Sequence, residues 1–184
     1  MIKYIRFAAA PTLTAFGAFF ALRGEHWMWV YFAMFAMIVI LGDFALGDNS
    51  TNPKYPSTKI LNFLLYINFP FLIIAVLASI WMVGDYPLPE WGSSSMVARE
   101  NTTIYDLVGY VIVMGLLVAS AGTNVGHELT HRKKNRFDMF LGNWFLAFTW
   151  DCAFAIEHVY GHHKYVATER DPATARRGQN PYSF

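Results

Sequence analysis

The chain has 184 residues, of which 55% are hydrophobic and 17% aromatic, whereas only 15% are charged. Soluble domains usually carry about 25% charged residues, so this composition excludes an ordinary soluble enzyme and a disordered chain. The net charge of +1 gives no bulk attraction to nucleic acid. A single cysteine, Cys152, excludes a disulfide framework and a cysteine-based zinc or iron–sulfur site within this chain.

Four apolar segments are long enough to span a bilayer as helices. They are Phe7–Leu22, Trp27–Leu46, Leu61–Val83 and Tyr105–Gly126. At 1.5 Å per residue the last two match a hydrocarbon core of about 30 Å, whereas the first reaches only roughly 24 Å and needs flanking residues. We therefore predict an all-α integral membrane protein with four transmembrane helices.

A fifth apolar stretch, Asp138–Ile156, is also long enough to span, but Asn143 and Asp151 would be costly against lipid. If this stretch does not cross and the N-terminus is cytoplasmic, twelve of the fourteen Lys and Arg residues lie on the cytoplasmic side; if it crosses, the split is eight to six. The positive-inside rule favours the first arrangement. We predict an in-plane or re-entrant helix there, with the histidine clusters on the cytoplasmic face.

Five of the six histidines form two clusters, His127-Glu-Leu-Thr-His131 and His158-Val-Tyr-Gly-His162-His163. A spacing of four residues places His127 and His131 one turn apart on one helix face, where two imidazoles can share a metal ion, and His158 and His162 repeat that spacing. His163 falls off this face of a regular helix. It therefore requires a break near Gly161 or a second metal ion.

The number of histidines bears on the kind of metal site. The HELTH motif alone fits an HExxH zinc protease, in which the glutamate activates water, as well as it fits an oxygenase. Five imidazoles exceed the three or four protein ligands of one zinc ion, so two metal ions are indicated. Imidazole suits iron, copper or zinc, and an apolar setting without a hydrolytic substrate favours redox metal and oxygen chemistry by elimination.

Several other residues have candidate supporting roles. Glu128 and Glu157 each adjoin a candidate ligand and are expected to accept a hydrogen bond from its second ring nitrogen, unless they are simply solvated carboxylates. If the fifth helix is continuous, Asp151 shares a face with Ala155, His158 and His162 and needs a polar partner.

Two patterns predict local structure. A face of small residues is expected to pack closely against a neighbouring helix, and it comprises Gly115, Ala119, Gly122 and Gly126. Asp171-Pro172 predicts the start of a helix, and Gly178 predicts its end.

Two stretches carry a resemblance to a known family. GHELTHR (126–132) and EHVYGHHKYVATERDPATARRGQN (157–180) closely resemble the first two histidine motifs of membrane alkane 1-monooxygenases and their xylene monooxygenase relatives. These enzymes belong to the integral-membrane fatty-acid desaturase and hydroxylase superfamily. The loop GDFALGDNSTNP (42–53) also looks like that of the family. The resemblance extends over essentially the whole chain.

The resemblance implies a non-haem di-iron centre that activates dioxygen and inserts one oxygen atom into an unactivated C–H bond, converting an alkane to a primary alcohol. The residues that match the family's iron ligands are His127, His131, His158, His162 and His163. Rubredoxin and rubredoxin reductase are the implied electron donors, and a bacterial cytoplasmic membrane is the implied location. No further catalytic or cofactor-binding residue is assigned.

The family pattern continues beyond this sequence. Because family members supply further histidine clusters after the second motif, we expect residues 1–184 to be a single di-iron oxygenase domain that is truncated at its C-terminus and inactive alone. A basic run is expected to attract an acidic electron carrier, although positive-inside topology also explains it: Arg132, Lys133, Lys134, Arg136, Arg176 and Arg177.

Alternative functions are distinguished by product and metal. A methyl-aromatic hydroxylase would form a benzyl alcohol, and a fatty-acid desaturase would form an alkene. An intramembrane zinc protease would hold one zinc ion per chain and depend on Glu128. A non-catalytic membrane protein would do none of these.

Overall fold

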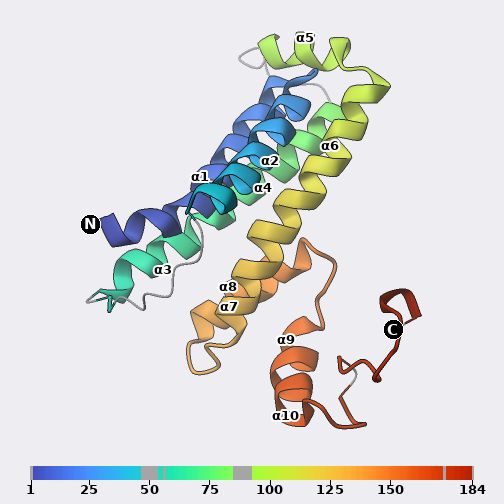
Figure 1. The fold of residues 1–184 in the computed structure, drawn as a ribbon. Coiled ribbons are helices and arrows are strands. Elements are labelled where there is room, and N and C mark those ends of the chain that lie inside the picture. The colour runs from blue at the N-terminus through green and yellow to red at the C-terminus, as the bar shows by residue number, and fades with distance from the viewer. Residues whose placement is uncertain (1, 47–53, 56, 85–92, 172, 184) are drawn as a thin grey trace. The chain divides into compact units, whose positions relative to one another are not determined.

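Figure 1 shows the computed structural model, which describes residues 2–46, 54–55, 57–84, 93–171 and 173–183. Every regular element in these residues is a helix, which confirms the predicted fold class. The chain forms two compact units, Met1–Gly122 and Thr123–Phe184. Each unit is described separately below.

The first unit is built from long apolar helices and two shorter ones. They are α1 (Ile2–Arg23), α2 (Trp27–Leu46), α3 (Thr58–Tyr66), α4 (Asn68–Val83), α5 (Ser93–Asn101) and α6 (Ile104–Leu117). A tight turn joins α1 to α2, where Gly24 and Glu25 adopt positive φ angles of 73° and 50°. Thr103 and Asp106 form a reciprocal capping box that starts α6.

Four candidate membrane spans match the four predicted segments. By length and hydropathy they are Tyr4–Arg23, Trp27–Ala45, Thr58–Val83 and Ile104–Thr130. The first begins before the predicted Phe7, so flanking residues do lengthen it. Large apolar side chains point outward from these helices, as at Phe44 (89% exposed) and Val111 (74% exposed). Such an apolar exterior is the surface expected of a protein embedded in lipid.

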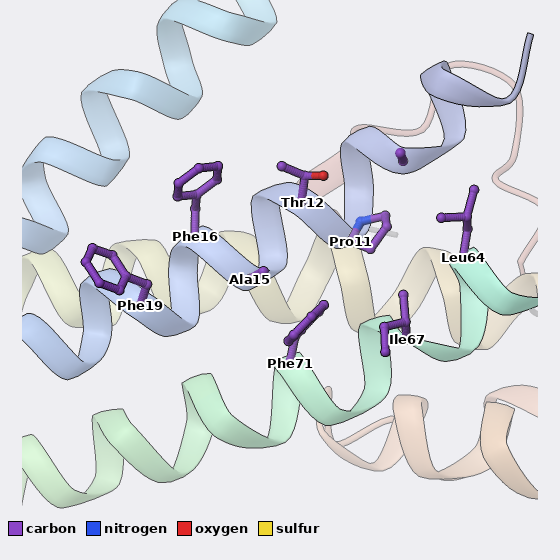
Figure 2. A pocket seen from close by; sticks show the side chains of 9 residues that line it. Pro11, Thr12, Ala15, Phe16, Phe19, Leu64, Ile67 and Phe71 are labelled. Carbon is purple, nitrogen blue, oxygen red and sulfur yellow. The ribbon is translucent and has the colours of Figure 1, made fainter. Parts of the chain in front are cut away.

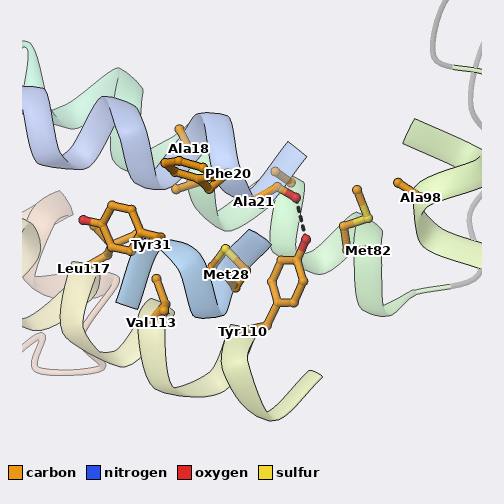
Figure 3. Packing of buried hydrophobic residues seen from close by; sticks show 12 residues of the cluster. Ala18, Phe20, Ala21, Met28, Tyr31, Met82, Ala98, Tyr110, Val113 and Leu117 are labelled. Atoms are coloured by element: carbon orange, nitrogen blue, oxygen red, sulfur yellow. Dashed lines mark hydrogen bonds between the residues drawn. The ribbon is translucent and has the colours of Figure 1, made fainter. Parts of the chain in front are cut away.

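The core of the first unit is a cluster of buried side chains from α1, α2, α4, α5 and α6 (Figure 3). Met28 and Tyr31 of α2 are fully buried in it. The Tyr110 hydroxyl of α6 donates a 2.6 Å hydrogen bond to the carbonyl of Ala21 in α1. A buried hydroxyl must find such an acceptor, so this bond fixes α6 against the end of α1.

An apolar groove of about 550 Å³ lies between α1 and the α3–α4 pair. Figure 2 shows Phe16 and Phe19 of α1 and Phe71 of α4 among the side chains along it. Pro11 lies inside α1 beside the groove and removes one backbone donor from that helix. Among the described residues that line the groove, Thr12 alone contributes a side-chain hydroxyl, so the groove is suited to hydrocarbon.

The second unit contains shorter helices around the histidine motifs. They are α7 (Asn124–Thr130), α8 (Arg136–Ala147), α9 (Phe154–Ile156), the π-helix η3 (Glu157–His162), α10 (His163–Tyr165) and the 3-10 turn η4 (Pro181–Ser183). A second π-helix, η2 (Val118–Thr123), lies directly before α7. Both histidine motifs are therefore next to, or inside, a π-helical segment.

The fifth apolar stretch is not one helix. Helix α8 has 12 residues and so extends roughly 18 Å, which is too short for a hydrocarbon core of about 30 Å. Residues 148–153 then form turns, in which Trp150 adopts a φ of 60°. This agrees with the prediction that the stretch does not cross as a single span. The predicted stripe from Asp151 to His162 required a continuous helix and does not form.

Close packing of α7 on α8 depends on Gly126 of α7 and Gly142 of α8. A Cβ atom on Gly126 would lie 2.8 Å from Leu146 Cγ and 3.0 Å from the Gly142 carbonyl oxygen. A Cβ on Gly115 would meet nothing within 4 Å. The predicted small-residue face is therefore confirmed as a packing surface at Gly126 and is wrong at Gly115. The π-helix η2 between them explains this, because its wider turns interrupt the 3.6-residue period.

The helix predicted to start at Asp171 is also absent from the described residues. Residues 173–180 form turns and irregular backbone. Asp171 does accept a backbone hydrogen bond as a capping residue would, from the Ala173 amide at 3.0 Å. Asp side chains close turns in the same way as they cap helices, so the local pattern alone did not separate the two outcomes.

Candidate metal centre

The first pair of histidines lies on α7 and its C-terminal cap. His127 and His131 are four residues apart, and their Nε2 atoms are 2.7 Å from each other. The Thr130 hydroxyl donates to the His127 carbonyl at 2.9 Å and so stabilises the last turn between them. This pair has the predicted i,i+4 arrangement.

The second pair is not the one predicted. The Nε2 atom of His158 lies 3.1 Å from that of His163, five residues later. Residues Glu157–His162 are π-helical, and a π-helix forms i→i+5 hydrogen bonds with more residues in each turn. This local widening brings His163 over His158, which is the irregularity near Gly161 that the sequence required if His163 was to take part.

The two pairs meet in one group. The ligand nitrogens of His127, His131, His158 and His163, the four-histidine group, all lie within 4.8 Å of one another. Ring centroids of His127 and His158 are 4.5 Å apart, and those of His131 and His163 are 4.8 Å apart. The Phe154 ring stacks on His158 with centroids 4.7 Å apart and shields one face of the group.

Burial and crowding favour neutral imidazoles. Burial, followed by the charges of the four neighbouring histidines, lowers the pKa of His158 from 6.5 to about 4. Burial and His127 likewise lower the pKa of His131, which lies just after the fourth candidate span. A neutral imidazole is the form that binds a metal, so at neutral pH these side chains need not lose a proton before binding.

His162 lies beside the four-histidine group but is not one of its members. Its ring stacks on that of His158 with centroids 5.4 Å apart, at an interplanar angle of 22°. Its Nδ1 atom lies 2.8 Å from Oδ2 of Asp171, whose side chain is fully buried. Sequence reasoning missed this contact because it interpreted Asp171 only as a helix cap.

The acidic residues singled out from the sequence have different surroundings. The exposed Glu128 carboxylate forms an ion pair with Arg132 at 3.0 Å. Arg132 also contacts Asp138, at 3.4 Å, whose side chain is buried. Glu157 is exposed, and Asp151 is half-buried in the turn after α8. Roles for Glu128, Glu157 and Asp151 beside the histidines remain predictions.

The loop after α7 connects the two motifs. The Lys133 ammonium donates to the Val159 carbonyl at 3.4 Å and lies 4.5 Å from the centre of the Tyr160 ring. Both contacts reach η3, so Lys133 holds the second motif near the end of the first. Lys134 in the same loop and Arg136 at the start of α8 are exposed.

Comparison with known proteins finds relatives over nearly the whole chain. Residues 101–184 match the fatty acid desaturase family. The chain is 30% identical over 177 residues to an alkane 1-monooxygenase of Pseudomonas putida and 33% identical over 172 residues to one of Ectopseudomonas oleovorans; each match covers 93% of this chain. It is 26% identical over 180 residues, 98% of its length, to the xylene/toluene monooxygenase hydroxylase component XylM of Pseudomonas putida, 45% of which is covered. This similarity extends over nearly the whole chain and is to members of the alkane 1-monooxygenase and xylene monooxygenase family.

The match to this family is partial on the relatives' side. The chain spans 38% of the length of each of the two alkane 1-monooxygenases. Both histidine motifs fall within the residues that match the desaturase family. No solved structure matches the chain significantly.

Proposed function

We propose that this chain supplies histidine ligands to a non-haem di-iron centre that hydroxylates an unactivated C–H bond of an apolar substrate. The observation that carries the proposal is the convergence of four imidazole nitrogens within 4.8 Å from two separate motifs. A structural role gives no reason for four such nitrogens to face one another, because each neutral imidazole has only one N–H group to donate. Bound metal ions would accept the lone pairs of these nitrogens.

The residues present fit iron. Imidazole is an accepted ligand of iron, and the low pKa of His158 keeps its nitrogen available at neutral pH. Iron bound there would supply the activation of dioxygen. The chain's own contribution is to hold the imidazoles: α7 sets the spacing of His127 and His131, the π-helix η3 aligns His158 with His163, and Phe154 covers one side.

The reaction needs electrons from another protein. One alkane, one dioxygen, two electrons and two protons give one alcohol and one water. Cys152 is the chain's single cysteine, so this sequence holds no cysteine cluster to carry these electrons. We propose rubredoxin, reduced by rubredoxin reductase, as the donor. The exposed Lys134 and Arg136 beside the second-unit histidines suit an acidic partner, whereas Arg132 and Lys133 are committed to internal contacts.

The relatives' names favour an alkane substrate over an acyl chain. Two of the relatives are alkane 1-monooxygenases and one acts in xylene or toluene oxidation. The apolar surface of the first unit suits a hydrocarbon that arrives through the bilayer of a bacterial cytoplasmic membrane. The predicted charge distribution places the histidines at the cytoplasmic face, where a soluble electron carrier can reach them.

A zinc protease is a weaker explanation. In that mechanism the glutamate of HExxH must approach the metal-bound water. The Glu128 carboxylate instead forms an ion pair with Arg132 one turn further along the chain. A catalytic zinc ion takes three protein ligands, so at least two of the five motif histidines would also have no role in such a site.

The proposal is tested by metal and product analysis. Membranes from cells that produce the protein are given rubredoxin, rubredoxin reductase, NADH and octane, and 1-octanol is measured by gas chromatography; iron and zinc are measured in the purified protein. We expect two irons per protein and oxygen-dependent 1-octanol when residues 1–184 are produced within a chain of the relatives' full length, with neither in the His158→Ala variant of that chain and neither from residues 1–184 alone. Zinc alone, peptide cleavage dependent on Glu128, or an alkene product would overturn it.

A further inference from the structure

Asp171 is a buried carboxylate in a stretch of chain that is otherwise mostly exposed. Its side chain is fully buried, whereas Glu169, Arg170 and Thr168 just before it are exposed. Three groups approach its two oxygen atoms. The Ala173 amide lies 3.0 Å from Oδ1, and the Thr174 hydroxyl and His162 Nδ1 both contact Oδ2, the latter at 2.8 Å.

These contacts determine the protonation of the carboxyl and of the ring. An ionised carboxylate only accepts hydrogen bonds, so the proton between Asp171 and His162 belongs to Nδ1 of the ring. The Ala173 amide and the Thr174 hydroxyl both donate to the carboxyl oxygens, which is the bonding that an ionised carboxylate accepts. With the proton on Nδ1, the Nε2 lone pair of His162 is free.

The remaining histidines present the same atom. His127 and His131 face each other through Nε2, and so do His158 and His163. A His162 ring that is protonated on Nδ1 therefore offers the atom that the four-histidine group uses. Its ring stacks on that of His158 and lies 5.6 Å from that of His163, centroid to centroid, so it is adjacent to the group.

We propose that Asp171 is a positioning residue that holds His162 in the Nδ1-protonated tautomer and so reserves its Nε2 atom for a metal ion. The metal in this inference rests on the proposed function, whereas the tautomer does not. A carboxylate that accepts a hydrogen bond from the second ring nitrogen of a ligand imidazole fixes the orientation of that ring and raises its basicity. The turn closed by Ala173 and Thr174 holds that carboxylate in place.

An amide in place of the carboxylate reverses this arrangement. In Asp171→Asn an NH₂ group replaces one of the two carboxylate oxygens. In the wild type, however, an N–H group approaches each oxygen: Ala173 N–H approaches Oδ1, and His162 Nδ1 approaches Oδ2. The Ala173 amide proton cannot move, so the amide oxygen faces Ala173 and the NH₂ group faces His162. The ring then lowers its energy by accepting at Nδ1, which transfers its proton to Nε2 and blocks that lone pair.

The tautomer is measured directly by long-range ¹H–¹⁵N NMR of the metal-free chain with ¹⁵N-labelled histidine, in detergent micelles at neutral pH. His162→Gln identifies the His162 signals. We expect the Nδ1-protonated pattern for His162 in the wild type and the Nε2-protonated pattern in Asp171→Asn. Glu169→Gln is the matched control, because it removes an exposed carboxylate two residues away and should leave the pattern unchanged. Thr174→Val removes one donor to Asp171 and should also preserve the wild-type tautomer.

A second measurement separates the inference from the proposed function. Titration of the same variants with Co²⁺, followed by visible absorbance, should show about 10- to 100-fold weaker binding in Asp171→Asn, with a similar loss in His162→Ala and little further loss in the double variant. Wild-type His162 protonated on Nε2, or an unchanged tautomer in Asp171→Asn, would overturn the role of Asp171. Absence of Co²⁺ binding by the wild type would overturn the metal site, while the NMR result would still decide the tautomer.

Discussion

The two histidine motifs have the same spacing of four residues but use it differently. On α7, His127 pairs with His131 across a regular turn, with Nε2 atoms 2.7 Å apart. On η3, His158 pairs with His163 five residues later at 3.1 Å, while His162 turns its Nδ1 atom to Asp171. The difference is one of backbone winding, since η3 is π-helical and α7 is α-helical.

This contrast shows what a π-helix gains at such a site. An α-helix brings two side chains at i and i+4 to one face, but a third adjacent histidine then points away. The wider turn in η3 brings His163 into the group and leaves His162 next to it. His158, His162 and His163 therefore all lie in or beside the four-histidine group although they come from one short segment. This agrees with the tendency of π-helices to occur at functional sites.

The largest expected effect distinguishes the members of the second motif. The ring of His158 contacts the rings of both His127 and His131. Loss of a residue that only hydrogen-bonds to a metal ligand costs about 10- to 100-fold in metal affinity, so loss of the ligand itself in His158→Ala should weaken Zn²⁺ or Co²⁺ binding by more than about 100-fold. His163→Ala should have an effect of similar size, measured by isothermal titration calorimetry. If His163→Ala bound metal like the wild type while His162→Ala did not, the pairing across η3 would be wrong.

The next effect concerns the support of the first motif. Gly126→Ala places a methyl group 2.8 Å from Leu146 Cγ and 3.0 Å from the Gly142 oxygen, so we expect a destabilisation of about 1–3 kcal/mol from overpacking between α7 and α8. Thermal unfolding in detergent measures this. Gly115→Ala is the matched control, because its added methyl group meets nothing within 4 Å. Equal stability of the two variants would contradict the α7–α8 packing.

Acid should affect the second motif through His158. Its pKa is about 4 in the folded protein against 6.5 ordinarily, so between these pH values the unfolded chain binds a proton that the folded chain does not. The free energy of unfolding of the metal-free protein should therefore fall as pH decreases from about 6.5 and level off near 4. His158→Gln should reduce this pH dependence, as measured by chemical unfolding at each pH. An undiminished dependence in that variant would exclude His158 as its source.

The smallest effect tests the contact between the motifs. Lys133→Met removes the bond to the Val159 carbonyl and the cation–π contact with Tyr160, which together should cost about 0.5–1 kcal/mol at an exposed site. Hydrogen exchange of the η3 amides should become faster. Lys134→Met removes an exposed charge from the same loop and should leave η3 exchange unchanged. Faster exchange in both variants would indicate a general effect of loop charge.

Much of this protein could be predicted from sequence because lipid imposes simple rules. Apolar runs of about 20 residues must be helices, and the four predicted segments correspond to the four candidate spans. Asn143, Asp151 and the Lys and Arg distribution predicted that the fifth stretch is not one more span, and this stretch does not form one long helix. The pairing of His127 with His131 followed from the α-helical period alone, since α7 has no irregular turn.

The remaining features depended on choices that the local sequence leaves open. By itself the sequence determined the helical class, the number of candidate spans and the residues that form the two histidine motifs, because hydropathy and the 3.6-residue period are local properties. Only the tertiary structure decided that η3 winds as a π-helix and that His163 rather than His162 joins the four-histidine group. It also decided that the His162 ring contacts the Asp171 carboxylate. A π-turn lacks a distinctive sequence pattern, and η3 is contacted by Lys133, which lies more than twenty residues earlier in the chain.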